Sequence, residues 1–198
     1  DFTAIGNHQL NSINRSTDGF IAQLDRDDFY NVNWARGFGF DGEDQTYSVV
    51  GWGHDEVVTG VLGEGNSSKS EFFQNGDAKM YFQLNKLNNE GKLIDEISFI
   101  SNGRINNAHI VKSSSWEELV VAFEFERNLY WSEGEIRSNG GFDIFSTTCN
   151  NFFIPNSNFI HMGGAWNDRL GQVIPMSSDS FLISSSFFQD FDLDGLNV

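Results

Sequence analysis

The sequence is poor in cysteine and proline, and both shortages limit the fold. Its 198 residues include one cysteine, Cys149, and two prolines. A single cysteine excludes an intrachain disulfide, which fits either a reducing compartment or a bacterial extracellular protein that avoids cysteine. Because proline is scarce beside 20 glycines, the turns are expected to use Gly, Asn, Asp and Ser.

Basic residues and long apolar runs are also scarce. The chain has 12 Lys and Arg against 28 Asp and Glu, a formal net charge of −16. A polyanion binds nucleic acid and anionic membranes poorly, so we expect neither partner. No apolar run approaches the ~18 residues of a membrane span, and no signal peptide is visible. Because the chain starts at Asp1 and not at Met, we interpret it as a processed or truncated piece.

Aromatic residues and short alternating segments are plentiful. There are 20 Phe, 5 Trp and 4 Tyr, enough to argue against disorder. Apolar side chains alternate with polar ones over short stretches around residues 20–24 and 80–84, whereas helical periodicity is almost absent. The pattern predicts an all-β fold in which the phenylalanines fill the core.

The sequence repeats at a constant step. The segment DEVVTGVL (55–62) has counterparts in EELVVAFEF (117–125) and DSFLISSSFF (179–188), so that equivalent residues lie 62 positions apart. The preceding segments keep the same step, starting at Asp44, Asn106 and Asp168. An upstream strand agrees less closely, because Asp18, Asp77 and Asp143 are separated by 59 and 66 residues.

Each unit of the repeat contains about four short strands, as a β-propeller blade does. We therefore predict four-stranded antiparallel blades, in units of approximately 1–63, 64–126 and 127–189, with the start of a further loop at 190–198. Propellers usually close with about four to eight blades. Three units would form an arc of a larger propeller, with further blades from the parent protein or other chains. A complete fold of another type remains the alternative.

Several residues form a loose pattern: Trp34, the turn at Gly39, Asp44, the strand Val57–Gly60, and Asp143 with Phe145. The pattern resembles the bacterial β-propeller repeat family known as SBBP. The Asp-Phe pair recurs at Asp1–Phe2 and Asp190–Phe191. Ala122 and Ser184 stand where the first unit has Gly60. The resemblance implies a secreted repeat protein with an adhesion or scaffold role, located outside the cell or at its surface.

The candidate ligand-binding residues are tryptophans near turns. Aromatic rings at loop tips are a common platform for sugars or peptides. Packing against the adjacent blade explains these positions about as well. The candidates are Trp52, Trp116, Trp131 and Trp166.

One acidic segment resembles the start of a calcium loop. DFDLDG places Asp190, Asp192 and Asp194 at alternate positions before a glycine, and hard oxygen ligands of this kind suit calcium. No later Glu completes the loop, and a loop of the blade repeat explains the segment as well. Apart from calcium here, the sequence points to no cofactor.

No catalytic constellation is recognisable. The four histidines lack metal spacing, and we expect Cys149 to be a buried side chain and not a nucleophile. Asx residues at the Asp44 position are expected to cap turns by accepting backbone N–H bonds. The sequence thus favours a non-enzymatic binding or scaffold module for a glycan or protein ligand. The alternatives are a carbohydrate-binding lectin and a glycoside-hydrolase propeller fragment, which would need an inward-facing pair of carboxylates.

Overall fold

The computed structural model describes residues 2–12, 16–28, 31–40, 42–65, 79–113, 118–177, 180–188 and 192–194. These residues form fifteen strands and no helix, and all strand pairings among them are antiparallel. The all-β class expected from the sequence is confirmed. The strands are β1 (Phe2–Ile5), β2 (His8–Asn11), β3 (Gly19–Leu24), β4 (Val32–Phe38), β5 (Asp44–Trp52), β6 (Glu56–Glu64), β7 (Met80–Leu87), β8 (Leu93–Ser101), β9 (Ile105–Lys112), β10 (Leu119–Trp131), β11 (Gly134–Cys149), β12 (Pro155–Gly163), β13 (Arg169–Ser177), β14 (Ser180–Ser186) and β15 (Asp192–Asp194).

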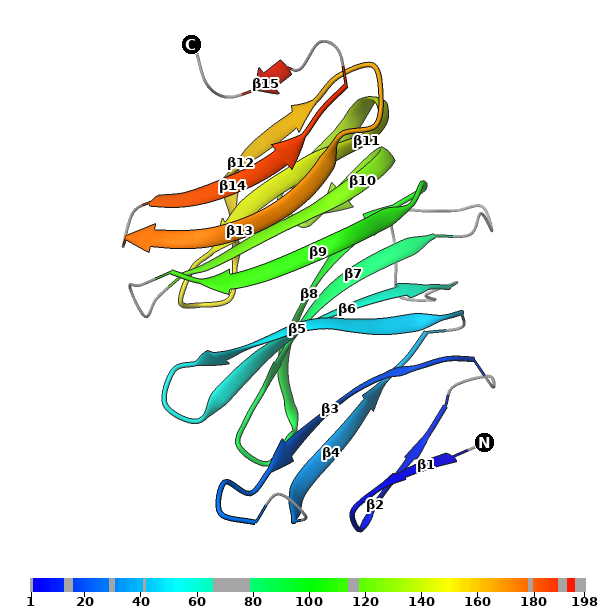
Figure 1. Cartoon of the computed structure of the whole chain (residues 1–198), viewed down its shortest axis with the longest axis vertical. Helices are drawn as coiled ribbons and strands as arrows, with labels where there is room; N and C mark the ends of the chain where they lie inside the picture. Colours follow the sequence, from blue (N-terminus) through cyan, green and yellow to red (C-terminus); the bar gives the residue numbers. More distant parts are fainter. Residues whose placement is uncertain are drawn as a thin grey trace.

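Two meanders of four strands form the centre of the molecule (Figure 1). In the first meander, β5 to β8 pair in chain order. In the second meander, β9 to β12 pair in the same way. The central pairings correspond closely, because Leu62 lies opposite Phe82 in the first meander and Glu124 opposite Ile144 in the second.

A short pairing joins the two meanders into one nine-stranded sheet. Leu129 and Tyr130 of β10 pair with Ser101 and Ile100 of β8, so that the sheet runs β15-β12-β11-β10-β8-β7-β6-β5, with β9 beside β10. The first part of β10 pairs with β9 and its end reaches over to β8. The register shifts between Glu126 and Asn128, where the intervening residue has a φ of 61°. A β-bulge of this kind bends a strand and increases its twist.

The main core lies between the two meanders and is built mainly from phenylalanine. Phe123 contacts both Phe82 and Phe99 of the first meander, with ring centroids 5.3 Å apart in each pair. Phe99 also contacts Phe145, at 5.8 Å. All four rings are fully buried. Tilted and edge-to-face rings at such distances add about 0.5–1.5 kcal/mol per pair to the burial of apolar area.

Hairpins cover the outer faces of both meanders. The β13–β14 hairpin packs on the second meander, where Leu170 and Val173 meet Val120 and Met162. The β3–β4 hairpin packs on the first meander through Trp34 and other residues in contact with Val61 and Leu87. Figure 1 shows the resulting stack of layers, with the β1–β2 hairpin beside β4 at the N-terminal end.

The bounds of further strands also differ by 62 positions. β8 (Leu93–Ser101) and β12 (Pro155–Gly163) differ by 62 positions at both ends, and β7 and β11 end at Leu87 and Cys149, again 62 apart. The steps of 59 and 66 between Asp18, Asp77 and Asp143 therefore do not align the strands that contain or follow these residues. The error arose because the comparison matched aspartates, which occupy different places in the two turns.

The units are divided differently from the prediction. Position 64 is the last residue of β6, which pairs along its whole length with β7 of the next predicted unit. Positions 126 and 127 lie inside β10. The expected boundaries at 63/64 and 126/127 therefore cut through paired strands. In addition, the β8–β10 pairing makes one large open sheet of strands that were expected to form separate blades.

The core predicts a large effect of removing one ring. Phe123→Ala should lower the free energy of unfolding by about 3–5 kcal/mol, because its side chain contacts rings of both meanders. Phe152→Ala is the matched control, since Phe152 is 75% exposed, and it should change stability by no more than about 0.5 kcal/mol. Urea denaturation followed by tryptophan fluorescence measures both. Equal losses for the two variants would contradict this assignment of the core.

Candidate functional site

A polar groove lies where β10 bends. It has a volume of ≈ 680 Å³ and is lined by residues of the β8–β9 turn and of the β10–β11 pair. The bend is held by three hydrogen bonds: Arg127 N–H donates to Ser138 Oγ (2.9 Å), Asn128 N–H to Asn102 Oδ1 (3.0 Å) and Asn102 N–H to the Asn128 carbonyl (3.3 Å). We call this feature the polar groove; its lining residues are Asn102, Arg127, Asn128, Arg137, Ser138, Asn139 and Gly140.

The composition of the polar groove contrasts with that of the whole chain. The chain carries a net charge of −16, yet the groove is lined by two arginines and no carboxylate. Both arginines are exposed. Arg127 Nη1 donates to the Asn102 carbonyl at 3.4 Å, and the Arg137 side chain has no hydrogen-bonding or ionic partner among the described residues. The groove therefore offers guanidinium N–H donors to a ligand.

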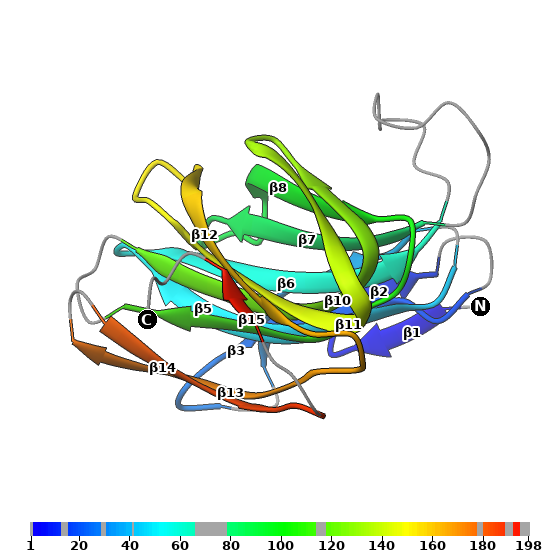
Figure 2. The same cartoon turned by 90° about the horizontal axis from the view of Figure 1, so that it is seen from above.

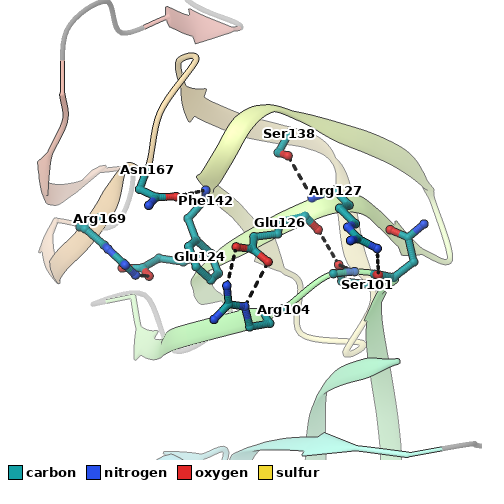
Figure 3. Close-up of polar contacts among 11 residues, drawn as sticks. Ser101, Arg104, Glu124, Glu126, Arg127, Ser138, Phe142, Asn167 and Arg169 are labelled. Atoms are coloured by element: carbon teal, nitrogen blue, oxygen red, sulfur yellow. Dashed lines mark hydrogen bonds and ion pairs between the residues drawn. The ribbon is translucent and has the colours of Figure 1, made fainter. Parts of the chain in front are cut away.

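Two glutamates near the groove form ion pairs with arginines that do not line it (Figure 3). Arg104 Nε and Nη2 each lie 3.2 Å from a carboxylate oxygen of Glu126. Arg169 Nη1 lies 2.8 Å from Glu124 Oε2. Both guanidinium groups also lie over the ring of Phe142, at 5.3 and 4.9 Å from its centroid. These carboxylates already have arginine partners, so Arg127 and Arg137 remain available for a ligand.

Glu124 is buried, and its carboxylate connects three strands. Its Oε1 accepts the Leu170 backbone N–H at 2.9 Å and the Asn107 side-chain amide at 3.2 Å. With Arg169 at the other oxygen, every partner comes from β9 or β13. A buried carboxylate that accepts this many bonds is stable when all partners are present and costly when they are removed. Glu124 thus fixes β13 on the outer face of β10.

A loop carrying an exposed tryptophan packs beside the groove. Gly140 approaches the backbone of Ala165 so closely that a Cβ at Gly140 would lie 2.3 Å from it. The same loop is held by Asn167 Oδ1, which accepts the Phe142 N–H at 3.0 Å. Between these residues stands Trp166, which is 52% exposed and meets Phe188 edge to face at 5.7 Å. An aromatic ring therefore stands on a loop that is packed against the groove lining.

Buried acidic residues bind the backbone of the groove lining and of the adjacent loop. Asp143 Oδ2 accepts the Asn139 N–H and lies 2.7 Å from His161 Nε2. Asp168 Oδ2 accepts the Gly164 N–H at 2.8 Å, and burial is the main factor that raises the pKa of Asp168. Because Asn139 lines the groove, its position depends on Asp143. This fixes one groove residue to the interior of the fold.

The predicted tryptophan site is not a single surface. Trp52 and Trp131 end β5 and β10 and are buried in the main core, 4% and 3% exposed. For these two residues the structure shows the packing role that the sequence left open. Trp116 lies outside the described residues. Trp166 is the candidate whose described position is exposed.

The predicted calcium residues are only partly described. Asp190 lies outside the described residues, and Asp192 and Asp194 lie in β15, with side chains that are not described. Calcium at this segment stays a prediction. Within the described ranges, no three His, Cys, Asp or Glu residues are placed so that they could hold a metal ion.

Two other sequence predictions are confirmed. Cys149 is fully buried, and burial raises the pKa of its thiol to about 12, so it is not an activated nucleophile. Asp44 Oδ2 accepts the Phe40 N–H at 2.7 Å, and Asp168 accepts the equivalent Gly164 N–H. These are the turn-capping bonds expected of an Asx residue at this position, and they are shown for Asp44 and Asp168 but not for the third such residue, Asn106.

The groove arginines had been missed in the sequence. Arg127 and Arg137 stand on opposite sides of the β10–β11 turn, and only the strand pairing brings them to one groove. The sequence feature that could have indicated this site is the scarcity of basic residues, which makes any pair of arginines unusual. In an acidic chain, two arginines on either side of a short turn are expected to come together on the hairpin.

Comparison with models of known protein families, with curated proteins and with solved structures finds no match to this chain. Among the residues that the structure describes, no helix is long and apolar enough to cross a membrane.

Removing the Glu124 carboxylate tests how much its buried hydrogen bonds contribute to stability. Glu124→Ala should lower the free energy of unfolding by about 1–3 kcal/mol, because it leaves the Leu170 N–H without its acceptor, whereas the half-exposed Arg169 can be solvated. The matched control is Glu126→Ala, whose partner Arg104 is exposed, and its cost should be about 0–1 kcal/mol. Urea midpoints of both variants compare the two. A cost for Glu124→Ala as small as the control's would show that the buried contacts contribute little.

Proposed function

We propose that this chain is a non-enzymatic binding and scaffold module of an extracellular or cell-surface protein, and that its polar groove holds an acidic carbohydrate. One observation carries the proposal: a groove with two arginines and no lining carboxylate occurs in a chain of net charge −16. Guanidinium groups bind carboxylates and sulfates in bidentate geometry. A cationic groove in an otherwise anionic surface favours an anionic ligand that is small or extended enough to avoid the remaining acidic surface.

The remaining groove residues suit a sugar. Asn102, Asn128 and Asn139 each use one amide atom in a bond within the protein, and an amide has further N–H groups and lone pairs for sugar hydroxyls. Trp166, exposed on the adjacent loop, supplies a ring of the kind that packs against sugar faces. Arginine for the acidic group, amides for the hydroxyls and an aromatic ring nearby together favour a uronate or sulfated sugar over a simple anion.

A glycoside hydrolase is less well supported than a binding module. Glycosidases use a pair of carboxyl groups that face the substrate. The polar groove is lined by no carboxylate, and the buried Glu124 and Asp143 are engaged by Arg169 and His161. The observation that favours the lectin alternative is the exposed pair of Trp166 and Phe188. Binding of a carbohydrate without turnover is common to both non-enzymatic alternatives.

We also propose that the layers continue beyond this chain, as in an arc of a larger propeller. The support comes from equivalent positions in the 62-residue step. Leu182 is 54% exposed, whereas its equivalents Val120 and Val58 are buried between layers. Phe20 is 50% exposed, whereas its equivalent Phe82 is fully buried. A further layer at each end, from the parent protein or from other chains, would cover these side chains as the inner ones are covered. The likeness to the SBBP repeat and the extracellular location stay predictions.

The groove predicts loss of binding to acidic sugars on removal of its arginines. Arg127→Ala with Arg137→Ala should weaken binding to an oligogalacturonate or a heparin fragment at least about tenfold, because both guanidinium groups are lost. Binding should also weaken as salt is added. Isothermal titration calorimetry against acidic and neutral oligosaccharides measures the effect. Catalytic release of reducing ends in the same samples would contradict the non-enzymatic assignment.

The matched control for this experiment is Arg26→Ala. Arg26 is exposed and precedes β4 in the β3–β4 connection, away from the groove residues. It removes one positive charge without changing the groove. If Arg26→Ala weakened binding as much as the loss of a groove arginine, general charge and not the groove would explain the affinity.

The bare end layers predict association between copies. Raising the salt concentration to about 0.5 M should promote self-association, because it screens repulsion between chains of the same charge while apolar contacts remain. Leu182→Asp with Phe20→Asp should reduce this association and change the stability of the monomer little. Sedimentation velocity over a range of concentrations measures it. A chain that stays monomeric at high salt would argue against coverage of these faces by other copies.

A further inference from the structure

The first part of β8 is an open edge of the large sheet. β8 pairs with β7 along its length, but on its other side β10 pairs only with Ile100 and Ser101. Among the described residues, no strand pairs with the other side of residues 93–98, which we call the β8 edge. Alternate N–H and C=O groups of a strand point to opposite sides. The β8 edge therefore presents backbone groups to a further strand.

The equivalent strand of the second meander has a short strand on its outer side. β12 lies 62 positions after β8, and on the side away from β11 it pairs with the short strand β15. His161 lies opposite Asp194 and Gly163 opposite Asp192, and these β12 residues are equivalent to positions 99 and 101 of β8. β15 therefore occupies the place that the end of β10 takes beside β8, and it shows that the outer side of such a strand can accept another strand.

A hollow of ≈ 410 Å³ lies beside the β8 edge. One wall is the edge itself, with Asp95 and Glu96, and the other is the β11–β12 turn, with Phe152, Ile154 and Pro155. In Figure 2 the β11–β12 connection and the β10–β11 hairpin lie at the top of the view, as β8 does. An added strand would therefore lie with its backbone on β8 and its side chains against this turn.

The turn is built to expose an aromatic ring. Asn150 Oδ1 accepts the N–H groups of Phe152 (3.0 Å) and Ile154 (3.1 Å), and Phe153 between them has a φ of 60°. This conformation is unfavourable for an aromatic residue. It places Phe153 in the main core while Phe152 is 75% exposed. The same turn occurs 62 residues earlier, where Asn88 Oδ1 accepts the Glu90 and Lys92 N–H groups and Gly91 has a φ of 72°.

The charge of the hollow indicates which strand would bind. Its lining includes two carboxylates and no basic residue. Acidic side chains at a free edge discourage pairing between copies of an acidic chain. The same carboxylates would attract a segment that carries Lys or Arg. Asp95 Oδ1 accepts the Glu96 N–H at 2.9 Å, and a bound strand would compete with this local bond.

We propose that the β8 edge and the adjoining hollow bind an extended basic peptide segment, which adds to the sheet as a strand. Backbone hydrogen bonds along the β8 edge hold the peptide, and the acidic and aromatic walls select its side chains. This inference is independent of the groove, which lies at the other end of β8 and carries the opposite charge.

The test uses a fluorescein-labelled peptide of about eight residues in which Lys and Thr alternate. Fluorescence anisotropy measures binding to the chain, and NMR locates the shifted amide signals, which should include those of residues 94–98. The same peptide with N-methyl groups on alternate residues keeps its charge but loses backbone donors. We expect the methylated peptide and a Glu/Thr peptide to bind at least about tenfold more weakly.

Variants separate this site from general charge. Asp95→Lys with Glu96→Lys should weaken binding of the Lys/Thr peptide at least about tenfold, and Phe152→Ala should weaken it less. The matched control is Asp27→Lys with Asp28→Lys, which reverses two exposed charges in the β3–β4 connection. The double variant without the groove arginines should bind the peptide normally, so failure of one proposal does not imply failure of the other.

Three results would overturn the inference. The first is no binding of the Lys/Thr peptide. The second is equal binding of the N-methylated peptide, which would exclude strand addition even if the charge-reversal variant failed to fold. The third is unchanged binding by a folded Asp95→Lys, Glu96→Lys variant, which would place the peptide elsewhere.

Discussion

The packing of Phe123 between Phe82 and Phe99 is the contact on which the rest of the structure depends. Each inner meander carries apolar side chains on both faces, so each face is covered by another layer. The two meanders cover one another through these rings, and hairpins cover the outer faces. The strand ends, turns and edges that remain outside this stack are the parts available for binding.

Both candidate sites arise where one meander ends and the next begins. β10 bends at Arg127 to reach β8, and the bend opens the polar groove. Because β10 reaches only the last residues of β8, no described strand pairs with the outer side of residues 93–98. One bulge therefore accounts for a basic groove at one end of β8 and for an acidic strand edge at the other.

The strands and the use of phenylalanine as core were predictable from the sequence, because alternating apolar residues are a local feature. The pairing was not, since a repeat fixes which segments are strands but not which segments are neighbours. The division at 63/64 therefore cut through the pairing of β6 with β7. Trp52 and Trp131 show the same limit, because position near a turn does not reveal that a ring points inward. Arg127 and Arg137 meet only through the pairing of β10 with β11.

The short bridge from Leu129 and Tyr130 to β8 has a consequence for unfolding. Layers of a repeat array that touch only through side chains can open one at a time, each with its own local stability. Here β10 belongs to one meander and is hydrogen-bonded to the other, so separating the layers also breaks backbone bonds in the middle of the molecule. The two inner layers should therefore open together as a single cooperative unit, while the outer hairpins fray first.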